Sequence, residues 1–184
     1  QAARRRRVID ATLALAGDGG FEAVQMRDVA TAANVALGTV YRYFSSKERL
    51  LLEANVEQIE ELDRRLRQRP PHGQSAADRV LDVLTRANAA LQRRPEITAA
   101  MIRALGTARP EDAAAVRKIT AAMTAIITGA MHEGAPSHRE LAVARALQQV
   151  WFSALIGNVG GVDSAGQVID DLEVAARLLL ADQD

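Results

Sequence analysis

The segment 26–47 constrains the fold of this chain more than any other stretch. Small apolar residues recur at helical spacing as far as Ala33, the run 34–38 breaks that spacing, and Val40 and Phe44 resume it four residues apart. Two short helices joined by a tight turn produce such a pattern, which is typical of a helix-turn-helix unit.

The second of these helices, at about 38–44, has an inward and an outward side. If Val40 and Phe44 pack inward, four other side chains of the helix lie on the outward side: Thr39, Tyr41, Arg42 and Tyr43. Hydroxyl groups and a guanidinium donate hydrogen bonds to phosphate oxygens, and a cation adds long-range attraction. The outward side therefore suits a nucleic-acid backbone.

These residues also carry a family resemblance. The heptapeptide GTVYRYF at 38–44, followed by SSKE at 45–48 and a run of leucines, resembles the signature of the TetR family of bacterial transcriptional regulators. The N-terminal third of the chain also matches at 19–21 and 27–30. The finer pattern, with GFEAVQMR at 20–27, VALG at 35–38, VWFS at 150–153 and ARLL at 176–179, resembles the KstR-type repressors of steroid catabolism.

The resemblance implies two domains, each with its own partner. Residues 1–47 are expected to form a three-helix, helix-turn-helix domain that binds a double-stranded DNA operator. Residues 48–184 are expected to form a helical ligand-binding and dimerisation domain. The DNA-contacting residues that the resemblance implies are Arg27, Leu37, Gly38, Thr39, Tyr41, Arg42, Tyr43 and Lys47.

Some positions depart from the family pattern or have two interpretations. Gln25 stands where a serine or threonine cap is usual, and Ala36 and Leu37 replace a serine and a polar residue, so the bases that are contacted stay open. The arginine run 4–7 either lies along phosphates or is a solvated basic tail. Lys47 either binds phosphate or is an ordinary exposed lysine.

Composition excludes several other classes of protein. The chain of 184 residues has no cysteine, which excludes disulfides and cysteine-based zinc sites and fits a cytoplasmic protein. Its net charge is +0, but the first 50 residues carry eight basic and five acidic side chains, so this part is the one directed toward a polyanion. The N-terminal basic and apolar segment superficially resembles a signal peptide, but Asp10 interrupts it. No stretch approaches the ~18 apolar residues of a membrane span, so no membrane partner is expected.

Caps and breaks divide the remaining chain into helices. Capping-box or proline signals predict helix starts at Ser45, Ser75, Pro95, Pro110, Ser137 and Ser164. Together with the helix-turn-helix pair they predict an all-α fold of about nine helices without strands, the others spanning about 3–17, 45–69, 75–94, 95–105, 110–132, 137–158 and 164–181.

The last two long helices have apolar residues on more than one side. Such a helix needs more than one packing partner, and the TetR resemblance implies a homodimer through this pair. The expected dimer residues are Leu147, Val150, Leu155, Leu172, Ala175 and Leu179. The alternative is an ordinary core pair in a monomer.

The middle helices mix flexible apolar residues with scattered polar groups. This mixture suits an apolar pocket with a few orienting groups, although the residues alone favour core packing beside a solvent-facing threonine row. The resemblance implies an effector cavity here, and the KstR-type pattern implies a small hydrophobic effector, a steroid or its acyl-CoA thioester. The expected ligand-binding residues are Asn88, Met101, Met123, Thr124, Ile127 and Trp151.

Two other classes of function compete with a regulator. For an enzyme, His72, His132 and His138 are the obvious candidates, but none has a partner at metal or triad spacing, so no catalytic residue, metal or cofactor is expected. A constitutive, non-specific DNA-binding protein should be more basic than a net charge of +0. We therefore expect a ligand-responsive repressor that binds a palindromic operator as a dimer.

Overall fold

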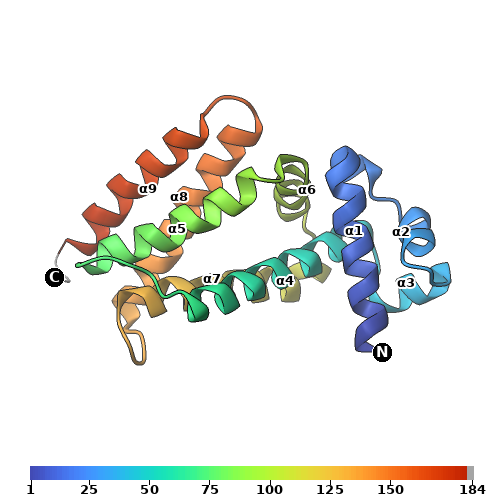
Figure 1. Ribbon diagram of the computed structural model, residues 1–184, viewed down its shortest axis with the longest axis horizontal. Helices are drawn as coiled ribbons and strands as arrows, with labels where there is room; N and C mark the ends of the chain where they lie inside the picture. Colours follow the sequence, from blue (N-terminus) through green and yellow to red (C-terminus); the bar gives the residue numbers. More distant parts are fainter. Residues whose placement is uncertain (182–184) are drawn as a thin grey trace. The chain divides into compact units, whose positions relative to one another are not determined.

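The computed structural model describes residues 1–181, and the last three residues of the predicted second domain lie outside that range (Figure 1). The described residues form nine α-helices and one short 3₁₀ turn without any strand, which confirms the all-α prediction. The helices are α1 (Ala2–Ala23), α2 (Met26–Ala32), α3 (Leu37–Tyr43), α4 (Lys47–Gln68), α5 (Ala76–Gln92), α6 (Pro95–Gly106), α7 (Ala113–Met131), α8 (His138–Val159) and α9 (Ala165–Leu180).

The chain divides into two compact units, each built from two separate stretches. Unit 1 contains residues 1–58 and 94–119, and unit 2 contains residues 59–93 and the chain from residue 120 onward. Helices α4 and α7 therefore contribute to both units. This division differs from a single cut after residue 47, because α6 belongs with the first helices of the chain.

A glycine pair interrupts α1 near its end. Gly19 and Gly20 leave helical geometry, and Gly20 has a φ of 65°, a left-handed conformation that costs glycine little. One more helical turn then follows to Ala23, which the sequence pattern did not predict. That turn carries Phe21 and Glu22.

Serine side chains begin three of the later helices as predicted. The hydroxyl oxygens of Ser75, Ser137 and Ser164 each accept a hydrogen bond from the backbone N–H three residues further on. Each such cap satisfies a donor that the helix cannot satisfy itself, and its loss costs about 1 kcal/mol.

Two predicted helix starts are wrong by a few residues. At the start of α4 the cap is Ser46, whose Oγ accepts the backbone N–H of Arg49 at 3.1 Å, and not Ser45. Pro110 begins a 3₁₀ turn, Pro110–Asp112, and α7 starts only after it.

Unit 1 packs its helices around α1. Figure 1 shows α2 and α3 beside α1, and α6 also contacts it, with Gly17 lying against the side chain of Ile97. The fully buried side chains of this unit include Val8, Ile9, Val24, Val29, Val40 and Leu50. Each large one stabilises the fold by about 1.5–3 kcal/mol relative to an exposed position.

Unit 2 packs α5 and α8 against α9. Figure 1 shows α8 and α9 side by side and antiparallel, joined by a short connection. The guanidinium of Arg177 on α9 lies 3.3 Å from a carboxylate oxygen of Asp78 on α5. Arg79 Nε donates to the carbonyl oxygen of Ala130 at 2.9 Å, which ties α5 to α7.

Within the described range, no helix combines the length and the apolar character that crossing a membrane requires.

Candidate nucleic-acid interface and effector site

The turn between α2 and α3 sets the direction of α3. Asn34 has a φ of 52°, and asparagine tolerates this left-handed region better than most residues that carry a Cβ. The backbone N–H of Val35 then donates to the carbonyl oxygen of Ala30 at 3.0 Å, which closes the turn. As the departure at Gln25 indicates, no side chain caps α2, and Gln25 Nε2 donates instead to the carbonyl oxygen of Glu22.

Helix α3 has the two sides that the sequence predicts. Val40 and Phe44 are buried, with 0% and 2% of their surface exposed. Tyr41 is 52% exposed, and Arg42 is exposed beside it. The other predicted DNA-contacting residues near this surface are Arg27 and Gly38, which are exposed, and Leu37 and Thr39, which are half-buried.

The sequence predicts that Tyr43 lies on the outward side of α3, and the structure differs at this residue. Its hydroxyl oxygen is buried and has no hydrogen-bond partner among the described residues. Its ring lies 6.2 Å from that of Phe44, and the guanidinium of Arg42 lies 5.4 Å from the Tyr43 ring centroid. In this conformation the Tyr43 ring packs beside Phe44 and Arg42, and its hydroxyl group is not exposed to a phosphate.

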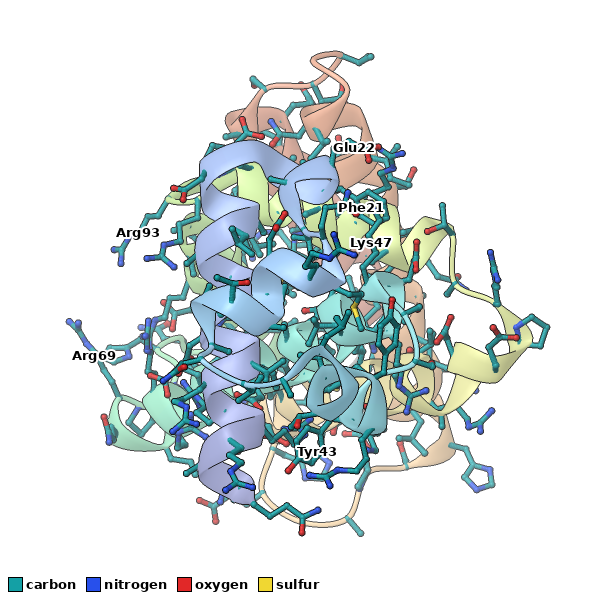
Figure 2. All side chains as sticks on the ribbon, turned by 90° about the vertical axis from the view of Figure 1, so that its right-hand side faces the viewer. Phe21, Glu22, Tyr43, Lys47, Arg69 and Arg93 are labelled. Carbon is teal, nitrogen blue, oxygen red and sulfur yellow. The ribbon has the colours of Figure 1, made fainter. Side chains whose placement is uncertain are left out.

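The Lys47 side chain has partners within its own chain. Its ammonium lies 3.4 Å from both the carbonyl oxygen of Phe21 and the carboxylate of Glu22, and 4.2 Å from the Phe21 ring centroid. Figure 2 shows these three residues together, with Tyr43 at a distance from them. The contacts hold the ammonium against the short turn at the end of α1.

Arg103 on α6 completes this cluster. Its guanidinium lies 2.7 Å from the Glu22 carboxylate and 4.4 Å from the Phe21 ring centroid. Arg103, and after it Lys47, lowers the pKa of the Glu22 carboxyl, since both cations favour the carboxylate. We call Phe21, Glu22, Lys47 and Arg103 the Glu22 cluster, and all four residues belong to unit 1.

The N-terminal arginine run is partly used inside unit 1. Arg5 pairs with Glu53 at 2.8 Å and with Glu57 at 2.6 Å, both on α4. Arg6 pairs with Asp10 at 3.0 Å and also reaches Glu57. These two arginines tie α1 to α4, so neither a solvated tail nor a wholly phosphate-facing cluster describes the run.

Unit 2 contains two buried polar atoms without a partner among the described residues. Asn88 on α5 is 3% exposed and its Oδ1 accepts no hydrogen bond, while Trp151 on α8 is 8% exposed and its Nε1–H donates none. Leaving a buried polar group unpaired costs about 1–3 kcal/mol, so such groups are rare in folded proteins. An acceptor and a donor are therefore available inside this unit.

Bonds between neighbouring helices locate the Trp151 indole. Gln148 Nε2 on α8 donates to Thr124 Oγ1 on α7, and Gln92 Nε2 on α5 donates to Asn158 Oδ1 on α8, both at 2.9 Å. Trp151 comes three residues after Gln148 and seven before Asn158, spacings that keep all three on one side of α8. The indole thus belongs to the side of α8 that meets α5 and α7.

Asn88 lies on the same inner region by the same reasoning. It precedes Gln92 by four residues, so both point from one side of α5 toward α8. On α7, Met123 and Ile127 are buried near Thr124. Five of the six predicted ligand-binding residues therefore belong to unit 2; Met101, buried on α6, belongs to unit 1.

The predicted dimer residues are partly wrong. Leu147, Leu155 and Leu172 are buried against their own chain, at 0%, 6% and 0% exposure, so they cannot form the contact with a partner. The other three predicted residues are half-buried: Val150, Ala175 and Leu179.

Other apolar side chains of α8 and α9 are exposed instead. They are Ile156 and Val159 on α8 and Val174 and Leu178 on α9, the last being 75% exposed. Phe152, half-buried one turn before Ile156, continues the row on α8 at helical spacing. We call these five residues the outer face of unit 2.

His132 and His72 have partners that the sequence did not reveal. His132 Nε2 lies 2.7 Å from Glu140 Oε1, and His132 Nδ1 lies 2.7 Å from the carbonyl oxygen of Glu133. The Glu133 carbonyl, and then Glu140, raise the pKa of His132. His72 Nδ1 lies 2.8 Å from the carbonyl oxygen of Pro70.

Comparison with protein families agrees with this geometry. The model of "Bacterial regulatory proteins, tetR family" matches residues 8–54, and "Tetracyclin repressor-like, C-terminal domain" matches residues 73–179. The chain belongs to the TetR family of DNA-binding transcriptional regulators, as its helix-turn-helix unit predicts.

Within the TetR family, the chain is similar to repressors named KstR. The chain is 42% identical over 182 residues to the HTH-type transcriptional repressor KstR of Rhodococcus jostii (strain RHA1), covering 99% of this chain and 85% of that protein. It is 38% identical over 184 residues to KstR of Mycobacterium tuberculosis (strain ATCC 25618 / H37Rv), covering 100% of this chain and 84% of that protein. These relatives confirm the resemblance to KstR-type repressors and imply a regulator rather than an enzyme.

A solved structure shows the same fold. The crystal structure of a TetR transcriptional regulator from Rhodococcus sp. RHA1 superposes with a TM-score of 0.93 at 34% identity, covering 99% of this chain and 98% of that one. Together, the relatives and the shared fold confirm the prediction of a DNA-binding transcriptional repressor.

Proposed function

We propose that this chain represses transcription as a homodimer on a palindromic operator and leaves the DNA when a small apolar effector binds in unit 2. One observation carries the DNA-binding part of the proposal. Helix α3 is anchored by the buried Val40 and Phe44 while Tyr41 and Arg42 remain exposed on its other side. Residues 1–47 would then form the DNA-binding domain, and the chain beyond would serve effector binding and dimerisation.

The chemistry of each exposed side chain suggests its contact. Arg42 can donate two parallel hydrogen bonds to O6 and N7 of a guanine in the major groove. Tyr41 and Thr39 carry hydroxyl groups suited to phosphate oxygens, and Arg27 adds a cation from α2. At Gly38 an added Cβ would meet no atom within 4 Å, so the start of α3 is open to close approach by a ligand.

The outer face of unit 2 supports a homodimer. An exposed apolar row on two adjacent helices favours burial against a second copy, because a two-fold axis brings the same row onto itself. Two copies of α3 spaced by ~34 Å, or a multiple, would match half-sites one DNA turn apart. We propose that the outer face of unit 2 contacts the second copy through Phe152, Ile156, Val159, Val174 and Leu178.

The unpaired atoms of Asn88 and Trp151 support an effector site between α5, α7 and α8. The effector would need an apolar body for Met123 and Ile127, an acceptor such as a carbonyl oxygen for the indole N–H, and a donor or a bridging water for the amide oxygen. A steroid, or its acyl-CoA thioester, meets these requirements and agrees with the KstR resemblance.

Effector binding would release DNA by differential affinity. The effector must bind one arrangement of the dimer better than the arrangement that fits the operator, and the equilibrium then shifts by that difference. Because the target is a bacterial promoter, we place this regulator in the cytoplasm.

A two-stage experiment tests the proposal. Thermal-shift screening of steroids, fatty acids and their acyl-CoA esters identifies ligands that raise the melting temperature, since a ligand that binds only the folded state stabilises it. The hits are then added to the protein bound to its own upstream DNA in an excess of bulk DNA. We expect a preference of about 10³-fold for the site and release by a stabilising ligand. Binding that shows no preference, or hits that never release DNA, would contradict the proposal.

A further inference from the structure

The Glu22 cluster places one carboxylate between two cations. Glu22 Oε1 lies 2.7 Å from the Arg103 guanidinium, and Glu22 Oε2 lies 3.4 Å from the Lys47 ammonium. Both cations also lie against the Phe21 ring, at 4.4 Å for Arg103 and 4.2 Å for Lys47. The contacts join the end of α1, the start of α4 and the third turn of α6.

The two pairings are unequal. The guanidinium contact has the length of a strong charge-assisted hydrogen bond, whereas 3.4 Å is at the long limit for an ammonium. One carboxylate cannot neutralise two cations, so the cluster keeps a net positive charge. The weaker partner, Lys47, therefore has the charge that is easier to redirect.

We infer that Arg103 is a positioning residue for DNA binding: by engaging Glu22 it keeps that carboxylate from neutralising Lys47, whose ammonium is then available to a DNA phosphate. The inference rests on the proposed DNA-binding function and on the phosphate contact that the TetR resemblance implies for Lys47. Without Arg103, Glu22 would pair with Lys47 alone, and a DNA phosphate would have to displace the Glu22 carboxylate from the Lys47 ammonium. Arg103 thus acts through Lys47 and need not touch DNA.

The test is a double-mutant cycle on operator affinity, measured by fluorescence anisotropy over a range of salt concentrations. The variants are Lys47→Ala, Arg103→Gln, Glu22→Gln and their pairwise combinations, with the matched control Arg109→Gln. Arg109 is an exposed unit 1 arginine, and its guanidinium lies a loose 3.9 Å from the Glu111 carboxylate. Circular dichroism melting checks that every variant is folded.

Lys47→Ala should weaken binding and lower the salt slope by about 0.9 per subunit, the value for one lost phosphate contact. Arg103→Gln should weaken binding by about 3–10-fold, with Arg109→Gln changing it less than about 2-fold. Adding Glu22→Gln to Arg103→Gln should restore affinity, because no carboxylate remains to compete for Lys47. In the Lys47→Ala background, Arg103→Gln should have almost no further effect.

Several outcomes would overturn the inference, and they are distinguishable from failure of the proposed surface. If Lys47→Ala weakens binding but Arg103→Gln does not, Arg103 has no part in DNA binding. If the effect of Arg103→Gln persists in the Lys47→Ala background, Arg103 acts only through long-range charge or packing. Failure of Glu22→Gln to rescue Arg103→Gln also refutes the competition. If Lys47→Ala itself leaves affinity and salt slope unchanged, the proposed phosphate contact of Lys47 is wrong, and this inference falls with it.

Discussion

Replacing Leu178 with aspartate should dissociate the proposed homodimer without unfolding the subunit. Full burial of a leucine side chain is worth about 1.5–3 kcal/mol. Leu178 is 75% exposed in the single chain, so covering it gains roughly 1–2 kcal/mol per copy. Two copies meet across a two-fold axis, so the loss is about 3 kcal/mol per dimer, or about a hundredfold in the dimer dissociation constant.

Sedimentation velocity over a concentration series measures that constant directly. Two control variants separate dimerisation from folding and from general surface effects. Leu172→Ala removes a fully buried side chain and should cost about 2–5 kcal/mol of folding stability. Val162→Asp changes an 83% exposed residue in the α8–α9 connection, away from the helical rows, and should leave the dimer unchanged.

A Leu178→Asp variant that sediments as a dimer with the same dissociation constant as the wild type would refute the outer face of unit 2 as the interface. Dissociation of the dimer by Val162→Asp, as strong as that by Leu178→Asp, would refute it equally. The first result would mean that the interface lies elsewhere than on the outer face of unit 2. The second would mean that dimerisation does not depend specifically on the exposed rows of α8 and α9.

Three further predictions concern the other parts of the account. Arg42→Ala should lose about 1–3 kcal/mol of preference at one base-pair position, read from a panel of operator variants; a uniform loss at all positions would assign Arg42 to phosphate. Trp151→Phe should lower effector affinity about 5–10-fold in a calorimetric titration while leaving the melting temperature of the free protein equal or higher, because it removes an unpaired donor; unchanged affinity would exclude the indole from the site. His132 has a folded-state pKa raised above 6.5 by the Glu133 carbonyl and by Glu140, so its stabilising contribution is complete below pH 6.5 and is lost as the pH rises through the raised value. Urea unfolding of the wild type and of His132→Gln between about pH 5.5 and 8.5 should therefore converge at the alkaline end.

Local features of the fold could be predicted from the sequence because local chemistry determines them. The caps at Ser75, Ser137 and Ser164 depend on residues three positions apart, and the pattern shows them directly. The burial of Val40 and Phe44 follows from helical spacing in the same way. At Ser45 and Ser46 two adjacent serines both fit a cap, so the pattern could not choose between them.

The site depends on contacts between distant residues, and those escaped prediction. Lys47 and Glu22 are 25 positions apart, and Arg103 comes from a helix that the pattern assigned to the other domain. The only local signal was the glycine pair before Phe21, which marks a chain break and gives no indication of what the next turn contacts. Tyr43 likewise seemed outward by spacing, but its hydroxyl is buried.

Three of the six predicted dimer residues were wrong for a different reason. Helices α8 and α9 are apolar on both sides, and periodicity alone does not say which side packs within the chain. Leu147 and Leu172 fill the core of unit 2, whereas Ile156 and Leu178 remain exposed. Only the packing of α5, α8 and α9 shows which of these apolar residues are buried and which are exposed.

The most direct measurement of the central claim maps α3 onto DNA. This 184-residue sequence has no cysteine, so Ala36→Cys, at the exposed start of α3, provides a single attachment point for an iron chelate that cleaves nearby DNA. The account predicts two clusters of cleavage related by the two-fold axis of the operator and separated by about 34 Å or a multiple of it. Cleavage that is diffuse, or that is reproduced with the chelate at Val162→Cys, would contradict the placement of α3 in the groove.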